Sequence, residues 1–291
     1  SKLSNRKILR ISRCFVTHTH IDHFFGFDGL LRTSLSKKDP VFFYGPKGII
    51  ENIKGKLKGY NFNLIKEYPI NIIVYEIRKD RILNCTFSSE KNLKPSKISE
   101  IKWLNNIVYE DKELSVKALL LNHRIPVLSY LFEEKKRINI NKDGLNKLGF
   151  ITGSWLTELK KLYLEGKNDV KLEVPTKDGA KVYKCSELFE KLIITKEGEK
   201  IFYLTDIKFS ENTMKKIKSF VHSPDLFYCE AFFTSSDEER ARDRYHLTSR
   251  QTNTIAKAIN AKKLIIFHFS PRYKGNYKKI YQEAFEGLSN Q

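Results

Sequence analysis

The chain has 291 residues, and the 41% that are hydrophobic are enough to bury the core of one large domain or two ordinary ones. Its apolar runs are of strand length, well short of the roughly 18 residues that a membrane span needs, and no signal segment is visible, so we expect a cytoplasmic protein that does not enter a membrane. Lysine and arginine number 53 against 34 acidic residues, a formal net charge of +19 that favours a polyanionic partner, although a coding bias toward Lys, Asn and Ile can produce the same excess.

Hydrophobic periodicity divides the first part of the chain into alternating strands and helices. We predict strands at residues 8–17 and 41–44, several more between 68 and 87, a strand-like run at 108–122 and a strand at 129–134. We predict helices at residues 22–35 and 48–57. The Gly45-Pro46 pair is expected to end the strand at 41–44.

Residues 135–198 differ from the sequence on either side, because they combine short helical patterns at 142–148 and 155–163 with polar connections rich in lysine. We expect them to form a basic excursion within a single domain that spans residues 1–291. Beyond them we predict strands at 201–205, 226–230 and 264–267 and helices at 210–221 and 248–261. Such interleaving of strands and helices predicts an α/β protein of layered sheets flanked by helices.

Three histidines and an aspartate fall within six positions, directly after the first predicted strand. His18 and His20 are two residues apart, so on an extended turn they point to the same side, whereas Asp22 and His23 follow where the helix begins. Imidazole nitrogen and carboxylate oxygen are ligands that zinc binds tightly. Four such groups would be hard to satisfy in a core without an ion, so we predict that this segment supplies ligands to two neighbouring metal ions.

Further candidate ligands stand at or near the ends of later strands, at His123, Asp206 and His268. A lone histidine at a strand end is more often a hydrogen-bonded structural residue, so these three are predicted as ligands only together with the cluster at 18–23. The cysteines are scattered and form no Cys-x-x-Cys pair, which predicts neither disulfides nor a thiolate zinc site.

Residues 18–23, His-Thr-His-Ile-Asp-His, match the signature of the metallo-β-lactamase superfamily. Other stretches resemble its ribonuclease Z branch, the tRNA 3′-processing endonucleases, and they follow the order of that branch along nearly the whole chain. These stretches are residues 43–48, 122–126, 229–233, 245–248 and 267–273. The separation of His246 from His268, 268 − 246 = 22 residues, also fits this branch.

The resemblance implies a metallo-β-lactamase-like αββα four-layer sandwich that binds two Zn²⁺ ions, and its mixed nitrogen and oxygen ligands would also accept manganese or iron. The ligands that it implies for the first ion are His18, His20 and His123. Those that it implies for the second ion are Asp22, His23 and His268, with Asp206 bridging the two.

The resemblance also assigns residues to the reaction. Those implied in catalysis are Asp22, His246 and Glu230, and those implied in substrate binding are Thr248 and Arg272. A metal-bound hydroxide would attack phosphorus, and His246, oriented by Glu230, would protonate the leaving 3′ oxygen. Structural alternatives stay open for two of them: His246 could bond to the backbone at a helix start, and Arg272 could form a salt bridge.

The sequence departs from the family in three places. The strands and the acidic, glycine-rich turn that precede the histidine cluster in the family are absent, so we expect a trimmed start. The segment around the bridging aspartate reads Thr205-Asp206-Ile207 rather than Gly-Asp-Thr. The glycine-proline motif of the tRNA-binding arm has its nearest match at residues 153–155, Gly-Ser-Trp, followed by Lys160 and Lys161.

We therefore predict a zinc-dependent phosphodiesterase, an endoribonuclease that cleaves the 3′ trailer of precursor tRNA, and the resemblance implies a homodimer. A first alternative is a small-molecule phosphodiesterase or lactonase, because one fold hosts many reactions. A second is a non-catalytic nucleic-acid-binding protein with a relic site. Relic sites lose ligands, whereas all seven candidate ligands are present here, which argues against this second alternative.

Overall fold

The computed structural model describes residues 3–288, which divide into two compact units. The larger unit contains residues up to 133 together with those from 200 onward, and the smaller unit contains residues 134–199. The smaller unit thus coincides with the segment at 135–198 that differs in composition. Its interpretation as an excursion within one domain stays a prediction.

The larger unit contains two β-sheets, the first with the order β1-β2-β3-β4-β5. Its strands are β1 (Arg13–Phe15), β2 (Val41–Pro46), β3 (Asn71–Ile77), β4 (Arg81–Ser88) and β5 (Ser99–Lys102). β1, β2 and β3 are parallel, and β4 and β5 continue the sheet in antiparallel pairs. β2 is covered on both faces, which explains why its sequence is a continuous apolar run and does not alternate.

The second sheet has the order β15-β14-β13-β8-β7-β6. Its strands are β6 (Ile107–Glu110), β7 (Leu114–His123), β8 (Ile125–Glu134), β13 (Lys200–Leu204), β14 (Leu226–Glu230) and β15 (Leu264–Phe267). β13, β14 and β15 are parallel, so their carboxyl ends lie at one edge of the sheet. β8 runs antiparallel to β13, which brings the turn between β7 and β8 to that same edge.

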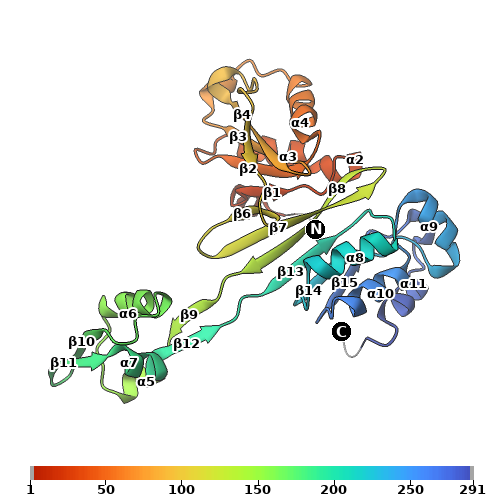
Figure 1. Ribbon diagram of the computed structural model, residues 1–291. Helices are drawn as coiled ribbons and strands as arrows, with labels where there is room; N and C mark the ends of the chain where they lie inside the picture. The colour runs from red at the N-terminus through yellow and green to blue at the C-terminus, as the bar shows by residue number, and fades with distance from the viewer. Residues whose placement is uncertain (1–2, 289–291) are drawn as a thin grey trace. The chain divides into compact units, whose positions relative to one another are not determined.

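The two sheets pack face to face in the larger unit (Figure 1). Tyr44 and Ile77 of the first sheet share a buried cluster with Val116 and Leu128 of the second. The hydroxyl group of Tyr130 in β8 donates to the backbone carbonyl of Val16, just after β1, at 2.8 Å and to that of Tyr44 in β2 at 3.2 Å. The interior between the sheets is therefore a single core that fixes one sheet against the other.

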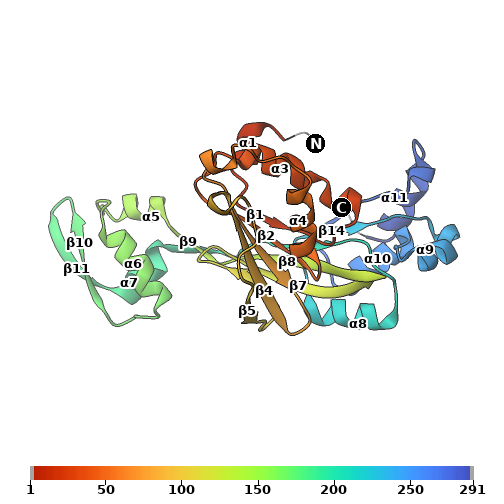
Figure 2. The same cartoon turned by 90° about the horizontal axis from the view of Figure 1, so that it is seen from above.

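Helices cover the outer face of each sheet (Figures 1 and 2). On the first sheet these are α1 (Asn5–Leu9), α2 (Ile21–Phe24), α3 (Gly26–Ser34) and α4 (Ile49–Lys58). On the second they are α8 (Glu211–Phe220), α10 (Ser249–Ala258) and α11 (Lys278–Phe285), and α9 (Glu238–Arg244) lies between β14 and α10 in the chain. The layers follow the order helix, sheet, sheet, helix, which confirms the predicted αββα sandwich.

Three local predictions were wrong in detail. The strand expected at 8–17 is shortened to β1, because α1 precedes it and packs Ile8 against the first core. The helix expected at 22–35 is interrupted at Phe25, between α2 and α3. The strand at 41–44 continues through Gly45 and Pro46, which pair with β3, and a Cβ atom on Gly45 would lie only 2.2 Å from the side chain of Ile49.

The smaller unit has its own hydrophobic core, formed around Leu159, Val174 and Leu188. Its helices are α5 (Lys142–Lys147), α6 (Trp155–Leu164) and α7 (Cys185–Leu192), and the first two confirm the predicted helical pieces. Its strands form two pairs, β9 (Arg137–Ile140) with β12 (Ile193–Lys196) and β10 (Lys171–Thr176) with β11 (Gly179–Lys184). No helix within residues 3–288 combines the length and hydropathy that a membrane span requires.

Candidate metal centre

The ends of several strands of both sheets bring the predicted ligands together. His18, His20, Asp22 and His23 follow β1, and His123 ends β7. Asp206, Glu230 and His268 lie at or just beyond the carboxyl ends of β13, β14 and β15, respectively. The parallel order of these three strands is the reason that residues far apart in the chain meet.

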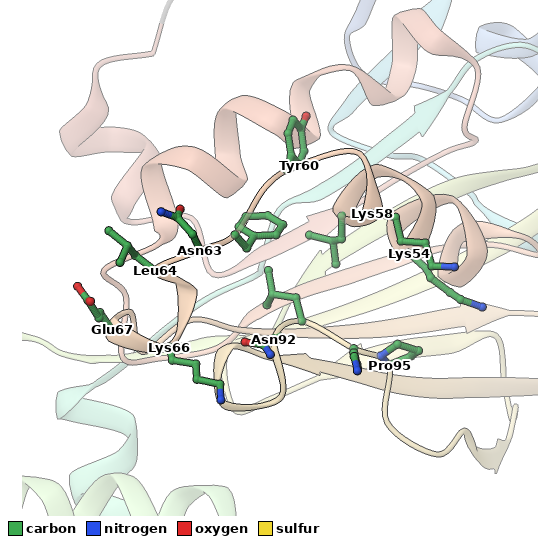
Figure 3. A pocket seen from close by; sticks show the side chains of 13 residues that line it. Lys54, Lys58, Tyr60, Asn63, Leu64, Lys66, Glu67, Asn92 and Pro95 are labelled. Atoms are coloured by element: carbon green, nitrogen blue, oxygen red, sulfur yellow. The ribbon is translucent and has the colours of Figure 1, made fainter.

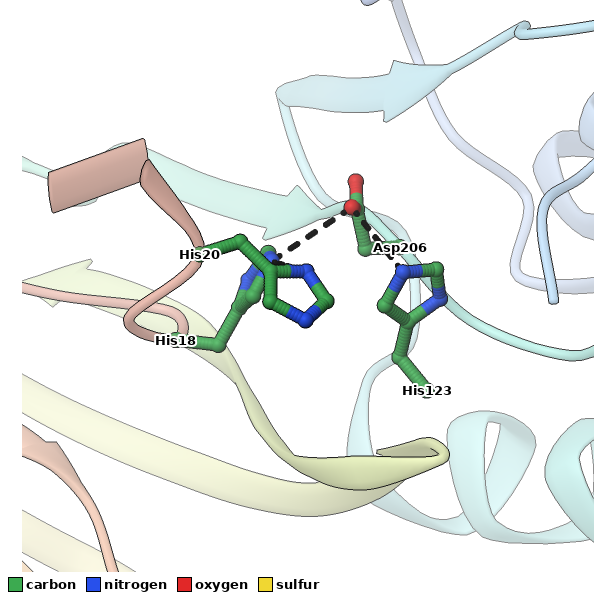
Figure 4. Close-up of side chains that lie close together, drawn as sticks. All are labelled: His18, His20, His123 and Asp206. Atoms are coloured by element: carbon green, nitrogen blue, oxygen red, sulfur yellow. Dashed lines mark hydrogen bonds and ion pairs between the residues drawn. The ribbon is translucent and has the colours of Figure 1, made fainter. Parts of the chain in front are cut away.

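His18, His20, His123 and Asp206 form a first cluster, in which candidate ligand atoms lie within 4.8 Å of one another (Figure 4). The Nε2 atoms of His18 and His123 each lie 3.5 Å from Oδ2 of Asp206. Nε2 of His18 is also 3.1 Å from Nδ1 of His20. Three imidazoles and one carboxylate at this spacing provide the four ligands that a tetrahedral zinc site uses.

Asp22, His23 and His268 form a second cluster within the same 4.8 Å limit. Nε2 of His23 lies 3.3 Å from Oδ2 of Asp22 and 3.5 Å from Oδ2 of Asp206. Nε2 of His268 lies 3.7 Å from the same Asp22 oxygen. Oδ2 of Asp206 is equally close to histidines of both clusters, and its role as a bridge stays a prediction.

His246 and Glu230 form a pair beside these clusters. Nδ1 of His246 lies 2.8 Å from Oε2 of Glu230. The other carboxylate oxygen of Glu230, Oε1, accepts a hydrogen bond from the backbone N–H of Ile207. The His246 ring stacks on Phe232 with a centroid distance of 4.0 Å. Within residues 3–288, Nε2 of His246 has no protein hydrogen bond. The same pair, with Asp206 and His268, also forms a third group of candidate ligand atoms within 4.8 Å.

Hydrogen bonds to the far side of the ligands orient them. Thr17 Oγ lies 3.2 Å from Nδ1 of His18, and the backbone carbonyl of Tyr245 accepts from Nδ1 of His123 at 2.7 Å. The Thr205 hydroxyl donates to Oδ1 of Asp206 at 2.6 Å. These contacts leave Nε2 of the two histidines and Oδ2 of the aspartate directed toward the centre.

The sequence reasoning missed Thr17, Thr205, Tyr245 and Phe232. Each is a near neighbour in the chain of a residue that was predicted, and that adjacency is the only signal the sequence contains. Which of them contacts which ligand depends on tertiary packing, because Tyr245 orients His123 across 122 positions of sequence.

Burial and the surrounding charges shift the pKa values of the centre in opposite directions. Burial lowers the pKa of His18 to about 3 despite the nearby Asp206 carboxylate. Burial also opposes ionisation of Asp206, but its histidine neighbours, above all His268, hold its pKa well below the usual range. Burial lowers the pKa of His268, whereas the carboxylates of Asp206 and Glu230 outweigh it and raise that pKa to about 10.

Two further observations support a metal ion at this set of donor atoms. Nδ1 of His268 is buried and has no hydrogen bond of acceptable geometry within residues 3–288, although it lies 3.0 Å from Oδ1 of Asp206. Four residues at the centre have a left-handed backbone, which costs energy in a residue other than glycine: Arg124, Asp206, Tyr245 and His268, with φ from 53° to 61°. Such strain is typical of functional sites that the surrounding fold holds in place.

Thr248 and Arg272 have structural partners. The Thr248 hydroxyl accepts a hydrogen bond from the backbone N–H of Gln251 and caps α10, and the residue is buried. Arg272 pairs with Asp237, with 3.1 Å between Nη1 and Oδ1. Arg272 nevertheless lines a hollow of about 420 Å³ together with His246. Substrate contact by either residue stays a prediction.

Comparison with known proteins gives consistent relatives. A ribonuclease Z from Synechocystis sp. is 32% identical over 273 residues, which cover 93% of this chain and 70% of that protein. A ribonuclease Z from Bacillus cereus is 31% identical over 285 residues, which cover 97% of this chain and 78% of that protein. No protein-family model matches the chain.

Among solved structures, the metallo-beta-lactamase fold protein YhfI from Bacillus subtilis aligns with a TM-score of 0.51 at 11% identity, over 96% of this chain and 71% of that one. At this low sequence identity the alignment is evidence for a shared fold only. It confirms the fold predicted from the histidine signature.

Proposed function

Since the chain belongs to the ribonuclease Z family and is a metal-dependent hydrolase with the metallo-β-lactamase fold, we propose that it cleaves the 3′ trailer from precursor tRNA. The observation that carries the proposal is the convergence of seven candidate metal ligands beside the His246–Glu230 pair. The net charge of +19 supports a polyanionic substrate.

We propose two Zn²⁺ ions, with manganese or iron as acceptable substitutes for this donor set. The first would be held by His18, His20 and His123, and the second by Asp22, His23 and His268, with Asp206 shared by both. When bound, such ions supply a nucleophile from water at neutral pH and stabilise charge on phosphate oxygens.

The protein's own residues would move the protons. Asp22 is the carboxylate of the second cluster, and its side chain is 61% exposed, so it can accept the proton of an incoming water. His246 would donate a proton from Nε2 to the leaving 3′ oxygen. Glu230 would hold the ring through Nδ1 and keep Nε2 in position, as a carboxylate does for a catalytic imidazole. Stacking on Phe232 fixes the ring plane.

We also propose that the protein acts on precursor tRNA in the cytoplasm and as a homodimer. The homodimer rests on the family alone. The single hydrolase domain at 1–291, with a basic excursion at 135–198, belongs to the same proposal.

An unprocessed tRNA transcript tests the proposed function directly. The protein should release a 3′ trailer of defined length, and a chelator should abolish the release until zinc is restored. Hydrolysis of bis-p-nitrophenyl phosphate or of a lactone without cleavage of the transcript would instead favour the small-molecule alternative. Absence of hydrolysis of all three substrates by zinc-loaded protein would contradict the proposal.

A further inference from the structure

A groove of about 840 Å³ opens in the larger unit next to the metal centre. We call it the Tyr245 groove, and the lining residues that matter here are Lys79, Trp103, Arg124, Lys208, Lys216 and Tyr245. It adjoins the centre directly, because Tyr245 precedes His246 and its carbonyl holds His123, while Arg124 follows His123. A molecule that extends from the metal centre could therefore continue into this groove.

The groove is basic. The guanidinium carbon of Arg124 lies 5.3 Å and Nζ of Lys208 lies 5.0 Å from the centroid of the Tyr245 ring. Lys79 and Lys216 are exposed. Within residues 3–288 none of these four cations has a carboxylate at ion-pair distance, and Arg124 donates instead to the backbone carbonyl of Asp243. Their charge is thus available to an anionic ligand.

Two aromatic side chains accompany these cations. Trp103 is half-buried, and its indole N–H has no hydrogen-bond partner within residues 3–288. Tyr245 is also half-buried, and its ring contacts Arg124 and Lys208. Sites that bind single-stranded nucleic acids combine cations along the phosphate backbone with aromatic rings on which the bases stack. A duplex would not use such rings, because its base faces are already stacked on one another.

We propose that the Tyr245 groove binds unpaired nucleotides of the RNA that adjoin the scissile phosphodiester. Phosphates would lie against Arg124 and Lys208, with Lys79 and Lys216 farther along the groove, and bases would stack on the aromatic rings. The proposal rests on the proposed function in that the substrate is taken to be RNA. It adds to that function, because it names the surface that would select an unpaired RNA strand over a paired one.

A second hollow provides a matched control. It measures about 680 Å³, and its lysines include Lys58 and Lys66, with Tyr60 beside them (Figure 3). None of the residues that line it belongs to the metal centre or to the Tyr245 groove. The variant K58Q/K66Q therefore removes the same charge as K79Q/K216Q but from another surface.

Binding is measured by anisotropy of fluorescein-labelled hexauridylate with the full chain loaded with zinc. K79Q/K216Q should weaken binding and lower the slope of log affinity against log salt by about 1.4, because each phosphate contact on a single strand contributes about 0.7. K58Q/K66Q should bind like the parent protein. Equal effects of the two double variants, or tighter binding of a 12-base-pair RNA duplex than of hexauridylate, would overturn the proposal.

A fluorescence measurement places the oligonucleotide. The chain has two tryptophans, and Trp155 is buried in the core of the smaller unit. In the W155F variant the remaining emission comes from Trp103, and hexauridylate should quench it with the same midpoint as the anisotropy titration. Binding without a change in Trp103 emission would contradict the assigned location.

Kinetics separate this inference from the proposed function. With precursor tRNA, K79Q/K216Q should raise KM about tenfold or more and leave kcat within about twofold, because the lost contacts bind substrate and transition state alike. Hydrolysis of bis-p-nitrophenyl phosphate should be unchanged. If the parent protein binds hexauridylate through the groove but does not cleave the transcript, the proposed function is wrong and the inference about the groove still holds. If it cleaves the transcript and K79Q/K216Q has the parent KM, only the inference about the groove is wrong.

Discussion

Oε2 of Glu230 lies 2.8 Å from Nδ1 of His246, and this carboxylate is completely buried at the end of β14. A buried carboxylate bonded to one ring nitrogen of an imidazole fixes the orientation of the ring and therefore the position of its other nitrogen. The arrangement places His246 beside the two proposed metal sites, and we assign it as a proton donor and to neither ion.

We expect the substitution His246→Ala to lower kcat for precursor tRNA by about 10²–10⁴, the range for loss of a general acid. Metal content and KM should stay close to those of the parent protein, because the residue is assigned to neither ion. Metal analysis by mass spectrometry and steady-state kinetics check this. A variant that loses metal together with activity would show that His246 is a ligand instead.

Asp206 should control the occupancy of both clusters. Its Oδ2 atom lies 3.5 Å from Nε2 of His18, His23 and His123. We expect about two zinc ions per chain in the parent protein, about one in His20→Ala, and fewer than one in Asp206→Asn, since each zinc needs about four ligands. Metal analysis after gel filtration measures these ratios, and retention of two ions by Asp206→Asn would contradict the bridging assignment.

Thr205 should raise the metal affinity without touching an ion. Its hydroxyl donates to Oδ1 of Asp206 at 2.6 Å. Thr205→Val removes this hydrogen bond at nearly constant volume and should weaken zinc binding by about 10–100-fold, the usual effect of losing a partner of a ligand. Thr254→Val, which removes an exposed hydroxyl bonded to the carbonyl of Arg250, is the control and should bind zinc normally. Competition with a chromogenic chelator measures both affinities.

Glu283 of α11 should make stability depend on acid pH. Its carboxylate accepts from the backbone N–H and the hydroxyl of Ser235, both at 2.7 Å, and from the hydroxyl of Ser249. Burial by itself raises the pKa of Glu283, but these hydrogen bonds lower it below its usual value. A depressed pKa contributes stability above the unfolded-state pKa, about 4.3, and loses it as pH falls through the folded-state value.

The substitution Glu283→Gln tests this dependence. At pH 7 it should lower the free energy of unfolding by about 1–3 kcal/mol, because hydrogen bonds to a charged acceptor are replaced by weaker ones. The difference from the parent protein should shrink as the pH falls below about 4.3. Urea titrations at several pH values measure this difference in the free energy of unfolding. A difference that grows toward acid pH would show that the pKa of Glu283 is not lowered by folding.

Several strands could be predicted from sequence with the bounds that the structure has. β14 at 226–230 and β15 at 264–267 are short apolar runs between polar residues, so pattern alone defines them. The hairpin of β10 and β11 was not predicted. Its strands contain exposed lysines and few apolar residues, so the alternating pattern typical of a strand is weak. α11 was missed as well, although tertiary packing buries its Ile280 and Ala284 in the second core.

The chain's own order of residues determined the local part of the centre. His18, His20, Asp22 and His23 lie within six positions, and the short turn after β1 limits them to one small volume whatever the rest of the chain does. The same local information indicated the metallo-β-lactamase superfamily, because that signature is contiguous, whereas the ribonuclease Z branch was indicated by stretches spread along the chain.

Only the tertiary structure decided that His123, Asp206 and His268 complete the centre. Their positions follow from the parallel pairing of β13, β14 and β15 and from the antiparallel pairing of β8, which gather the strand ends at one edge. The partners Tyr245 and Thr205, and the cations of the Tyr245 groove, likewise depend on which loops meet there. Pairing between distant strands is cooperative and long-range, so no window of sequence contains it.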